Sequence, residues 1–143
     1  MRHSLRVAYV TGYRPPVHPA LIVDALLGYS LVGAPRPRLA ALIRWAGTSG
    51  IPVLSLDVPS GVDATTGETP GEYLPANRTL TLALPKTGLR PDHSGEVILA
   101  DLGVPGEVFR RVSIPYRSPF GARFSVSLRM VTESTTGDDT GRS

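Results

Sequence analysis

A mainly apolar stretch, Ile51 to Leu56, constrains the fold of this chain more than any other feature of its sequence. It is bounded by Gly50 and Pro59 and is too short for a helix, so it predicts a buried strand of a parallel sheet. Asp57 and Ser60 follow it closely. Ligands of open α/β sheets bind beyond the carboxyl ends of the strands, which makes both residues candidates for a functional site. The alternative is that Asp57 accepts backbone N–H groups in a turn and Ser60 caps one.

A second apolar stretch, Leu21 to Leu27, contains Asp24 at a position where an unpaired charge would be costly. Asp24 must therefore be satisfied by backbone and hydroxyl donors, or bind a cation or ligand at the strand end. Between the two stretches, Pro37 suits the first turn of a helix and Gly47 its end. The apolar stripe of that helix consists of Leu39, Leu42, Ile43 and Ala46. The order strand, helix, strand predicts a parallel pair with a right-handed crossover, and places the two strand-end carboxylates near one edge of the sheet.

The remaining strands and the two ends of the chain are less regular. Thr79 to Leu84 and Glu96 to Leu102 are predicted strands, and Arg123 to Val131 has the pattern of another. Leu5 to Val10 is compatible with a short strand. We expect an atypical N-terminal segment over residues 1–20, the α/β domain over 21–125, and a disordered tail over 126–143.

Composition narrows the classes of function. The 143 residues suit one domain, and the net charge of +3 comes without a basic block or an aromatic RNA-binding signature, so no nucleic-acid partner is expected. The absence of cysteine excludes disulfides and thiolate chemistry, and a cytoplasmic location is expected. No apolar run approaches the roughly 18 residues that span a bilayer, so no membrane partner is expected either.

Two common catalytic patterns are missing. The histidines lie far apart and none has the spacing of a zinc site: His3, His18 and His93. Ser60 lacks the flanking glycines of a nucleophile elbow, because Val58 and Val62 occupy those places. A metallohydrolase and a serine hydrolase are therefore not indicated.

Two further features are weak indications of ligand binding. The loop Gly28 to Pro35 is bounded by glycine and could approach a phosphate, but it lacks both the P-loop ending and the spacing of a dinucleotide fingerprint. Lys86 follows the third strand, where it either offsets the charge of a substrate phosphate or is simply solvated.

Four segments, in order, resemble the second half of the NAD(P)H-hydrate epimerases, the YjeF amino-terminal domain family. They are VDALLGYSLVGAPRPRLAALIRWAG, PVLSLDVPSGVDATTG, ANRTLTLALPKTGL and GEVILADLGVP. The resemblance implies an α/β fold, a Rossmann-like three-layer α/β/α sandwich with a mainly parallel sheet, present in part. It also implies an isomerase that interconverts the R and S epimers of hydrated NADH or NADPH, a metabolite repair activity. A homodimer is compatible with it.

The resemblance also implies roles for particular residues. Asp24 and Ser60 correspond to ligands of a potassium ion, and Asp57 corresponds to an acidic residue that touches the substrate. The residues that would surround the substrate phosphates are Gly28, Tyr29, Ser30, Leu31, Val32, Gly33 and Ala34. Epimerisation at a carbon that bears a hydroxyl group needs proton transfer, so our hypothesis is that Asp57 is the general acid and base.

The chain departs from the family pattern in one respect. The family's first half contains a loop of the form Gly-Asn-Asn-Gly-Gly-Asp-Gly that completes the site, whereas Asn77 is the single asparagine here and belongs to the third segment. We therefore expect a truncated or partial member. The alternatives are a catalytically inactive copy that serves as a binding or scaffold module, and a generic doubly wound nucleotide binder.

Overall fold

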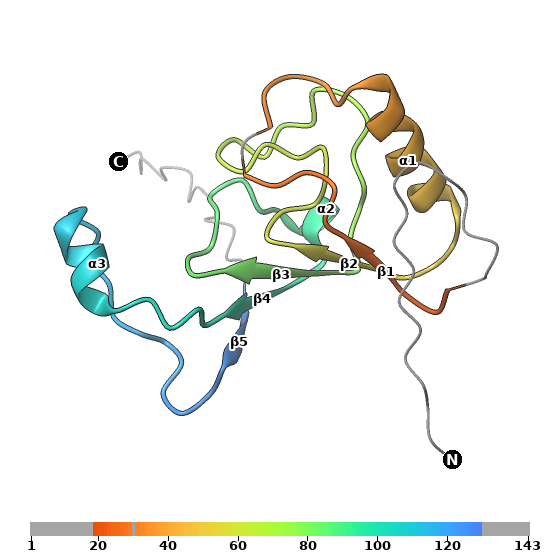
Figure 1. Cartoon of the computed structure of the whole chain (residues 1–143). Helices are drawn as coiled ribbons and strands as arrows, with labels where there is room; N and C mark the ends of the chain where they lie inside the picture. Colours follow the sequence, from red (N-terminus) through yellow and green to blue (C-terminus); the bar gives the residue numbers. More distant parts are fainter. Residues whose placement is uncertain (1–18, 30, 130–143) are drawn as a thin grey trace, which may run out of the picture.

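The computed structural model describes residues 19–29 and 31–129, which form one sheet and three helices (Figure 1). The sheet has five strands in the order β1-β2-β3-β4-β5. Their bounds are Ile22–Asp24 (β1), Val53–Leu56 (β2), Arg78–Leu82 (β3), Glu96–Ala100 (β4) and Ser125–Leu128 (β5). Neighbours from β1 to β4 run parallel, and β5 is antiparallel to β4. The predicted α/β class with a mainly parallel sheet is confirmed.

The helices are α1 (Pro37–Thr48), α2 (Pro91–Ser94) and α3 (Gly106–Arg111). The first is the predicted one: proline occupies its first turn, and Ile43 and Ala46 of its apolar stripe are buried. It extends one residue past Gly47, the predicted end, and the left-handed turn that follows is made by Gly50, with φ 72°. None of the described helices is long and apolar enough to cross a membrane.

Every predicted strand within the described residues is found, but each is shorter than predicted. The pattern over residues 123–131 forms β5, so residues 126–128 belong to the sheet and not to the tail that composition indicated. The strand proposed for residues 5–10, the rest of the N-terminal segment up to residue 18, and residues 130–143 lie outside the described residues.

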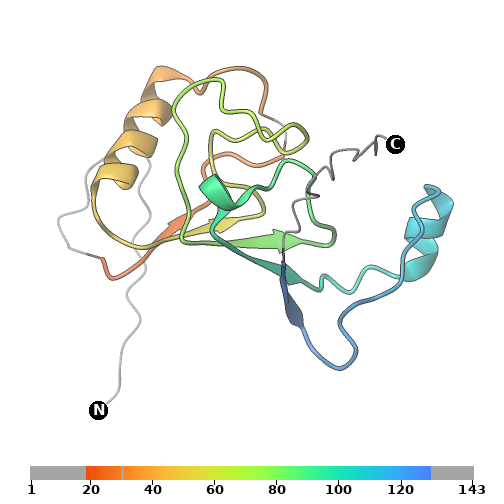
Figure 2. The same ribbon diagram turned by 180° about the vertical axis from the view of Figure 1, so that it is seen from behind.

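One face of the sheet is covered by helices and loops (Figure 2). α1 contacts this face through Ile43 and Ala46, which cluster with Val53 of β2. α2 lies over β3, where the Thr79 hydroxyl donates a hydrogen bond to the Ser94 carbonyl at 2.7 Å. The segment after β2 adds a second apolar cluster: Val58, Val62, Ala64, Leu89 and Val97. This side therefore holds the core of the described structure.

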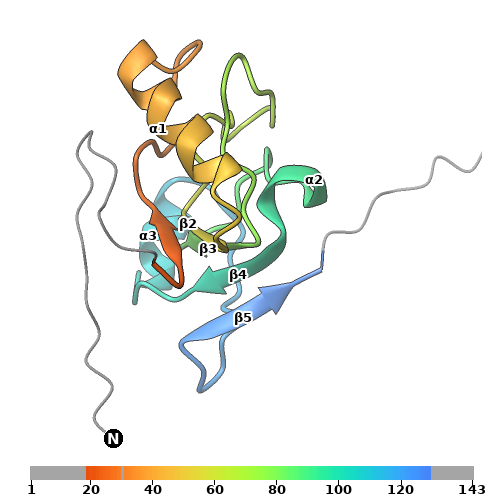
Figure 3. The ribbon, with the colours of Figure 1, turned by 90° about the vertical axis from the view of Figure 1, so that its right-hand side faces the viewer.

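The opposite face carries no helix among the described residues, and α3 lies beyond the carboxyl ends of the strands (Figures 1 and 3). Half-buried apolar side chains from alternate strand positions line this face: Leu54, Leu56, Leu80, Leu82 and Ile98. Val23 of the edge strand β1 is 55% exposed. Parallel sheets generally have both faces covered, so this apolar face is the part of the fold best suited to a further layer.

Candidate functional site

Asp24 ends β1 and is 2% exposed. Both of its carboxylate oxygens accept hydrogen bonds. Oδ1 accepts from the Ser60 hydroxyl at 2.6 Å and more weakly from the Leu26 N–H at 3.4 Å, and Oδ2 accepts from the Ser60 N–H at 2.8 Å and the Ser55 hydroxyl at 2.9 Å. A buried carboxylate is tolerated only when its lone pairs are satisfied in this way. Asp24 therefore ties β1 to β2 and to the turn after β2.

Ser60 lies at the tip of that turn, where its side chain is fully buried. The next residue, Gly61, has φ 93°, and a Cβ atom there would lie 2.2 Å from the Glu72 carbonyl oxygen. Only glycine fits such a place, so Gly61 lets the backbone turn and direct the Ser60 N–H toward Asp24. The Ser60 hydroxyl oxygen also accepts from the Leu27 N–H at 2.9 Å. This serine thereby joins the turn to the start of the 28–34 loop.

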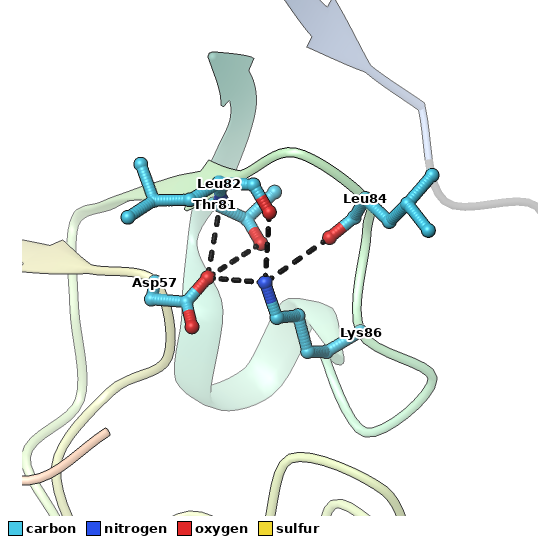
Figure 4. Close-up of polar contacts among 5 residues, drawn as sticks. All are labelled: Asp57, Thr81, Leu82, Leu84 and Lys86. Atoms are coloured by element: carbon cyan, nitrogen blue, oxygen red, sulfur yellow. Dashed lines mark hydrogen bonds and ion pairs between the residues drawn. The ribbon is translucent and has the colours of Figure 1, made fainter. Parts of the chain in front are cut away.

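Asp57 lies at the carboxyl end of the neighbouring strand, β2, but differs from Asp24 in backbone conformation and in hydrogen-bond partners. Its backbone has φ 68°, a left-handed conformation that is uncommon for a residue other than glycine, although aspartate tolerates it better than most. The Asp57 N–H donates to the Leu80 carbonyl at 2.8 Å. Its Oδ1 atom accepts from the Leu82 N–H at 3.1 Å, from the Thr81 hydroxyl at 3.5 Å and from Lys86 (Figure 4). Backbone strain of this kind concentrates at functional sites.

Lys86 forms an ion pair with Asp57, and the two side chains are 16% and 21% exposed. Its ammonium group also donates to the Leu82 carbonyl at 2.9 Å and the Leu84 carbonyl at 3.2 Å. Sequence reasoning considered Lys86 as a partner of substrate phosphate or as a solvated side chain, and missed the contact with Asp57. The parallel pairing of β2 and β3 was the available signal, because it brings both strand ends to one edge of the sheet.

The loop assigned to substrate phosphates borders a cavity of about 360 Å³ at the start of α1. Five of the predicted residues are found there or on its rim: Gly28, Leu31, Val32 and Ala34 line it, and Gly33 turns the loop with φ 71°. Tyr29 is 67% exposed and does not line the cavity, and Ser30 lies outside the described residues. Sequence reasoning missed four further lining residues: Leu27, Pro35, Arg36 and Leu39.

The structure thus brings Asp24 and Ser60 into direct contact and keeps Asp57 in a separate cluster with Lys86. Asp24 and Asp57 end adjacent parallel strands, as predicted, since Asp24 pairs in register with Ser55. Ser55 itself was missed. The alternation of β2 contained the signal, because a serine among apolar residues on the buried side of a strand needs a polar partner.

Two other titratable groups are perturbed. Burial lowers the pKa of His93, which is 2% exposed. Its Nδ1 atom forms a hydrogen bond with the Ser94 hydroxyl at 2.9 Å. Hydrogen bonds from the Thr66 and Thr65 N–H groups lower the pKa of Asp63, which is half-buried and shapes a turn. Among the described residues, no group of three His, Cys, Asp or Glu side chains is arranged to hold a metal ion.

A family model described as "YjeF-related protein N-terminus" matches residues 3–88. The chain belongs to this family. The matched range includes the Asp24–Ser60 and Asp57–Lys86 contacts, and it also takes in most of the first twenty residues, which the sequence analysis set apart. The described fold is therefore a YjeF-related fold.

The chain is similar in sequence to proteins named for NAD(P)H-hydrate epimerisation or repair. One is the NAD(P)H-hydrate epimerase of Dehalogenimonas lykanthroporepellens, 54% identical over 109 residues, which are 76% of this chain and 44% of that protein. Another is the bifunctional NAD(P)H-hydrate repair enzyme Nnr of Hyperthermus butylicus, 42% identical over 106 residues, which are 73% of this chain and 20% of that protein. The chain thus spans less than half the length of these relatives.

A solved structure, titled crystal structure of yeast ynu0, YNL200c, has a similar fold. The TM-score is 0.62 at 20% sequence identity, and the match covers 76% of this chain and 46% of the yeast chain. At this level of identity the likeness concerns the fold alone. The fold of most of this chain is thus found in a solved protein.

Proposed function

We propose that this YjeF-related chain takes part in epimerising the R and S forms of hydrated NADH or NADPH, the activity for which its relatives are named. The observation that carries the proposal is Asp57: a partly exposed carboxylate in a left-handed backbone conformation, at the carboxyl end of a parallel strand and paired with Lys86. A positioned carboxylate is one of the groups that can act in general acid and base catalysis. In this proposal Asp57 moves the proton at the carbon-bound hydroxyl of the substrate.

The substrate phosphates would lie against the loop of residues 28–34 beside α1. The cavity there and the positively charged Arg36 at its edge support this placement. The exposed side chain of Tyr29 is available to cover a bound nucleotide, since aromatic side chains pack well against flat rings.

We also propose that Asp24 and Ser60 take part in binding a potassium ion. Ser60 Oγ lies 2.6 Å from Asp24 Oδ1 and 3.3 Å from the Leu27 carbonyl oxygen, so three oxygen atoms converge. A set of oxygen ligands with one carboxylate suits a hard cation. The Leu27 N–H holds the Ser60 oxygen in place, and an ion that binds Asp24 Oδ1 would displace the Ser60 hydroxyl proton that bonds to this oxygen in the structure. When bound, the ion would neutralise the buried charge of Asp24.

The test is epimerisation of R-NADHX by the purified chain, followed by absorbance with an S-specific dehydratase as the coupling enzyme. We expect turnover in potassium chloride that falls at least 100-fold in Asp57→Asn, the range that removal of a general acid–base group produces. Asp101→Asn is the matched control, because Asp101 is exposed and its carboxylate accepts a hydrogen bond from the nearby Gly103 N–H. Absence of turnover by the folded wild-type chain would contradict the proposal.

One observation favours a second candidate, a non-catalytic binding module. The apolar sheet face of Leu54, Leu56, Leu80, Leu82 and Ile98 carries no described helix. A module that works through this face would bind a partner with unchanged affinity after Asp57→Asn, whereas the epimerase would lose its activity.

A further inference from the structure

We propose that Lys86 is the positioning residue of the site: its ammonium group fixes one oxygen of Asp57 and leaves the other, Oδ2, to the substrate. The inference rests on the proposed function, because it assigns a geometry to the acid–base group named there. It makes Lys86 part of the machinery of Asp57 and not a contact for substrate phosphate.

The ammonium group has three N–H donors and three acceptors around it. These acceptors are Asp57 Oδ1 and the carbonyl oxygens of Leu82 and Leu84 (Figure 4). Every proton of the group is therefore used. A phosphate could recruit Lys86 only by breaking one of these bonds in a side chain that is 16% exposed. The described geometry thus favours a fixed ammonium group over a mobile phosphate ligand.

Backbone strain lies on both sides of this ammonium group. Among the described residues, three residues other than glycine have positive φ, and two of them are Asp57 at 68° and Ala83 at 61°. Ala83 lies between the two residues whose carbonyls Lys86 bonds, in a tight turn where the Leu84 N–H donates to the Leu82 carbonyl at 2.7 Å. Such conformations persist only where surrounding contacts overdetermine them. Lys86 supplies contacts to both turns at once.

The identity of the residue supports the same conclusion. Of the 15 lysine and arginine residues in the sequence, Lys86 is the only lysine. An ammonium group is compact and directs three donors tetrahedrally, whereas a guanidinium group is planar and directs its donors in a fork. Three oxygens that converge on one nitrogen match the ammonium group alone. The prediction is that arginine does not replace lysine at this position.

The consequence for Asp57 is an asymmetric carboxylate. Oδ1 accepts from the Leu82 N–H, the Thr81 hydroxyl and Lys86, while Oδ2 accepts no hydrogen bond from any described residue. With Oδ1 fixed, the side chain cannot rotate freely, and Oδ2 keeps one direction. Positioning of this kind lowers the cost of reaching a reactive geometry.

Because the chain has one lysine, ¹⁵N-lysine labelling gives a single side-chain signal by NMR. We expect the Lys86 ammonium protons to exchange with water at least tenfold more slowly than those of free lysine. In Asp57→Gly, which removes the acceptor and suits the left-handed backbone, this protection falls. The control Asp101→Gly leaves it unchanged. Exchange at the rate of free lysine in the wild-type chain would overturn the proposal whatever the activity of the chain.

Kinetics separate positioning from substrate binding. Lys86→Met should lower kcat at least tenfold with KM within about twofold, and Lys86→Arg should not restore kcat; Arg123→Met controls for loss of an exposed cation. A raised KM with unchanged kcat would overturn the proposal in favour of phosphate binding. A protected ammonium group in a wild-type chain without turnover would overturn the proposed function and the positioning role together. If Lys86→Met does not fold, the labelled wild-type chain and Asp57→Gly still decide the geometry.

Discussion

Asp24 and Asp57 end adjacent parallel strands of one sheet, yet their surroundings differ in every respect that matters for chemistry. Asp24 is 2% exposed, lies in regular strand backbone and has hydrogen bonds to both oxygens. The Asp57 side chain is 21% exposed and is held at one oxygen by the Lys86 ammonium group, and the Asp57 backbone has φ 68°. A saturated buried carboxylate stabilises its neighbours, whereas a strained carboxylate with a free oxygen is available for reaction. We therefore expect the same residue type, at the ends of two adjacent strands, to serve two purposes.

The largest expected effect is on stability at the first of the two carboxylates. Asp24→Ala leaves the Ser60 N–H and the Ser55 hydroxyl without an acceptor in a buried place, and leaves the Ser60 hydroxyl with only the Leu27 carbonyl at 3.3 Å. We expect the free energy of unfolding to fall by about 3–5 kcal/mol, measured by urea denaturation. Asp101→Ala, on the surface, should change it by less than about 0.5 kcal/mol. A loss below about 1 kcal/mol for Asp24→Ala would remove the contrast between the two carboxylates.

Asp57→Asn should have the opposite effect: a small loss of stability and a large loss of activity. Asparagine tolerates the left-handed backbone and keeps an acceptor for the Leu82 N–H and for Lys86, so we expect a smaller stability loss, about 1–2 kcal/mol. Epimerisation should nevertheless fall at least 100-fold, about 2.7 kcal/mol in activation free energy. Thermal unfolding and the coupled assay on the same preparation check both numbers. Equal losses of stability in Asp57→Asn and Asp24→Asn would contradict this assignment.

Ser60→Ala sharpens the account of Asp24. The change removes the hydroxyl that links Asp24 to the Leu27 N–H but leaves the Ser60 backbone bond in place. We expect a stability loss of about 1–2 kcal/mol. Potassium should raise the melting temperature of the wild-type chain more than sodium does, because a ligand that binds the native state stabilises it. This difference should vanish in Ser60→Ala, and its persistence would place the ion elsewhere.

The smallest expected effect is a pH dependence that involves neither carboxylate. Burial lowers the pKa of His93 in the native state, while Asp92 raises it and Arg90 lowers it. The unfolded chain therefore binds more protons as the pH falls through about 6.5, and the free energy of unfolding decreases below that pH. His93→Gln should flatten the stability curve between about pH 7.5 and 5.5. An unchanged slope of stability against pH in His93→Gln would assign the pH dependence to other groups. The stability of the Asp24 variants should be measured above about pH 7.5, where His93 does not contribute.

The sequence was a good guide to elements and a poorer guide to their ends. Hydrophobic periodicity predicted α1 and the parallel strands, because the two signals used, the helical stripe and the short apolar run, are both local in the sequence. α3, a short helix after Pro105, was missed because six residues carry too little periodic signal. The β5 residues 126–128 were assigned to a tail because their partner, β4, lies far away in the sequence.

In the candidate site, too, the local sequence signals were informative and the contacts between distant residues were not predicted. A charge in an apolar strand had to find a partner, which is why Asp24 could be singled out and why its contact with Ser60 agrees with that reasoning. The contact between Asp57 and Lys86 depends on two left-handed turns made without glycine, at Asp57 and Ala83. Turns of this kind have no sequence signature, because alanine at positive φ is exceptional. The geometry of that pair could only be seen in the folded chain.

Stability and epimerisation measured together in Asp24→Asn and Asp57→Asn distinguish the two aspartates. We expect Asp24→Asn to lose the greater part of its free energy of unfolding, because the new amide meets the Ser60 N–H and two hydroxyls that need acceptors. We expect Asp57→Asn to remain folded and to lose turnover. A stable, inactive Asp24→Asn beside an active Asp57→Asn would contradict the proposed roles of both residues.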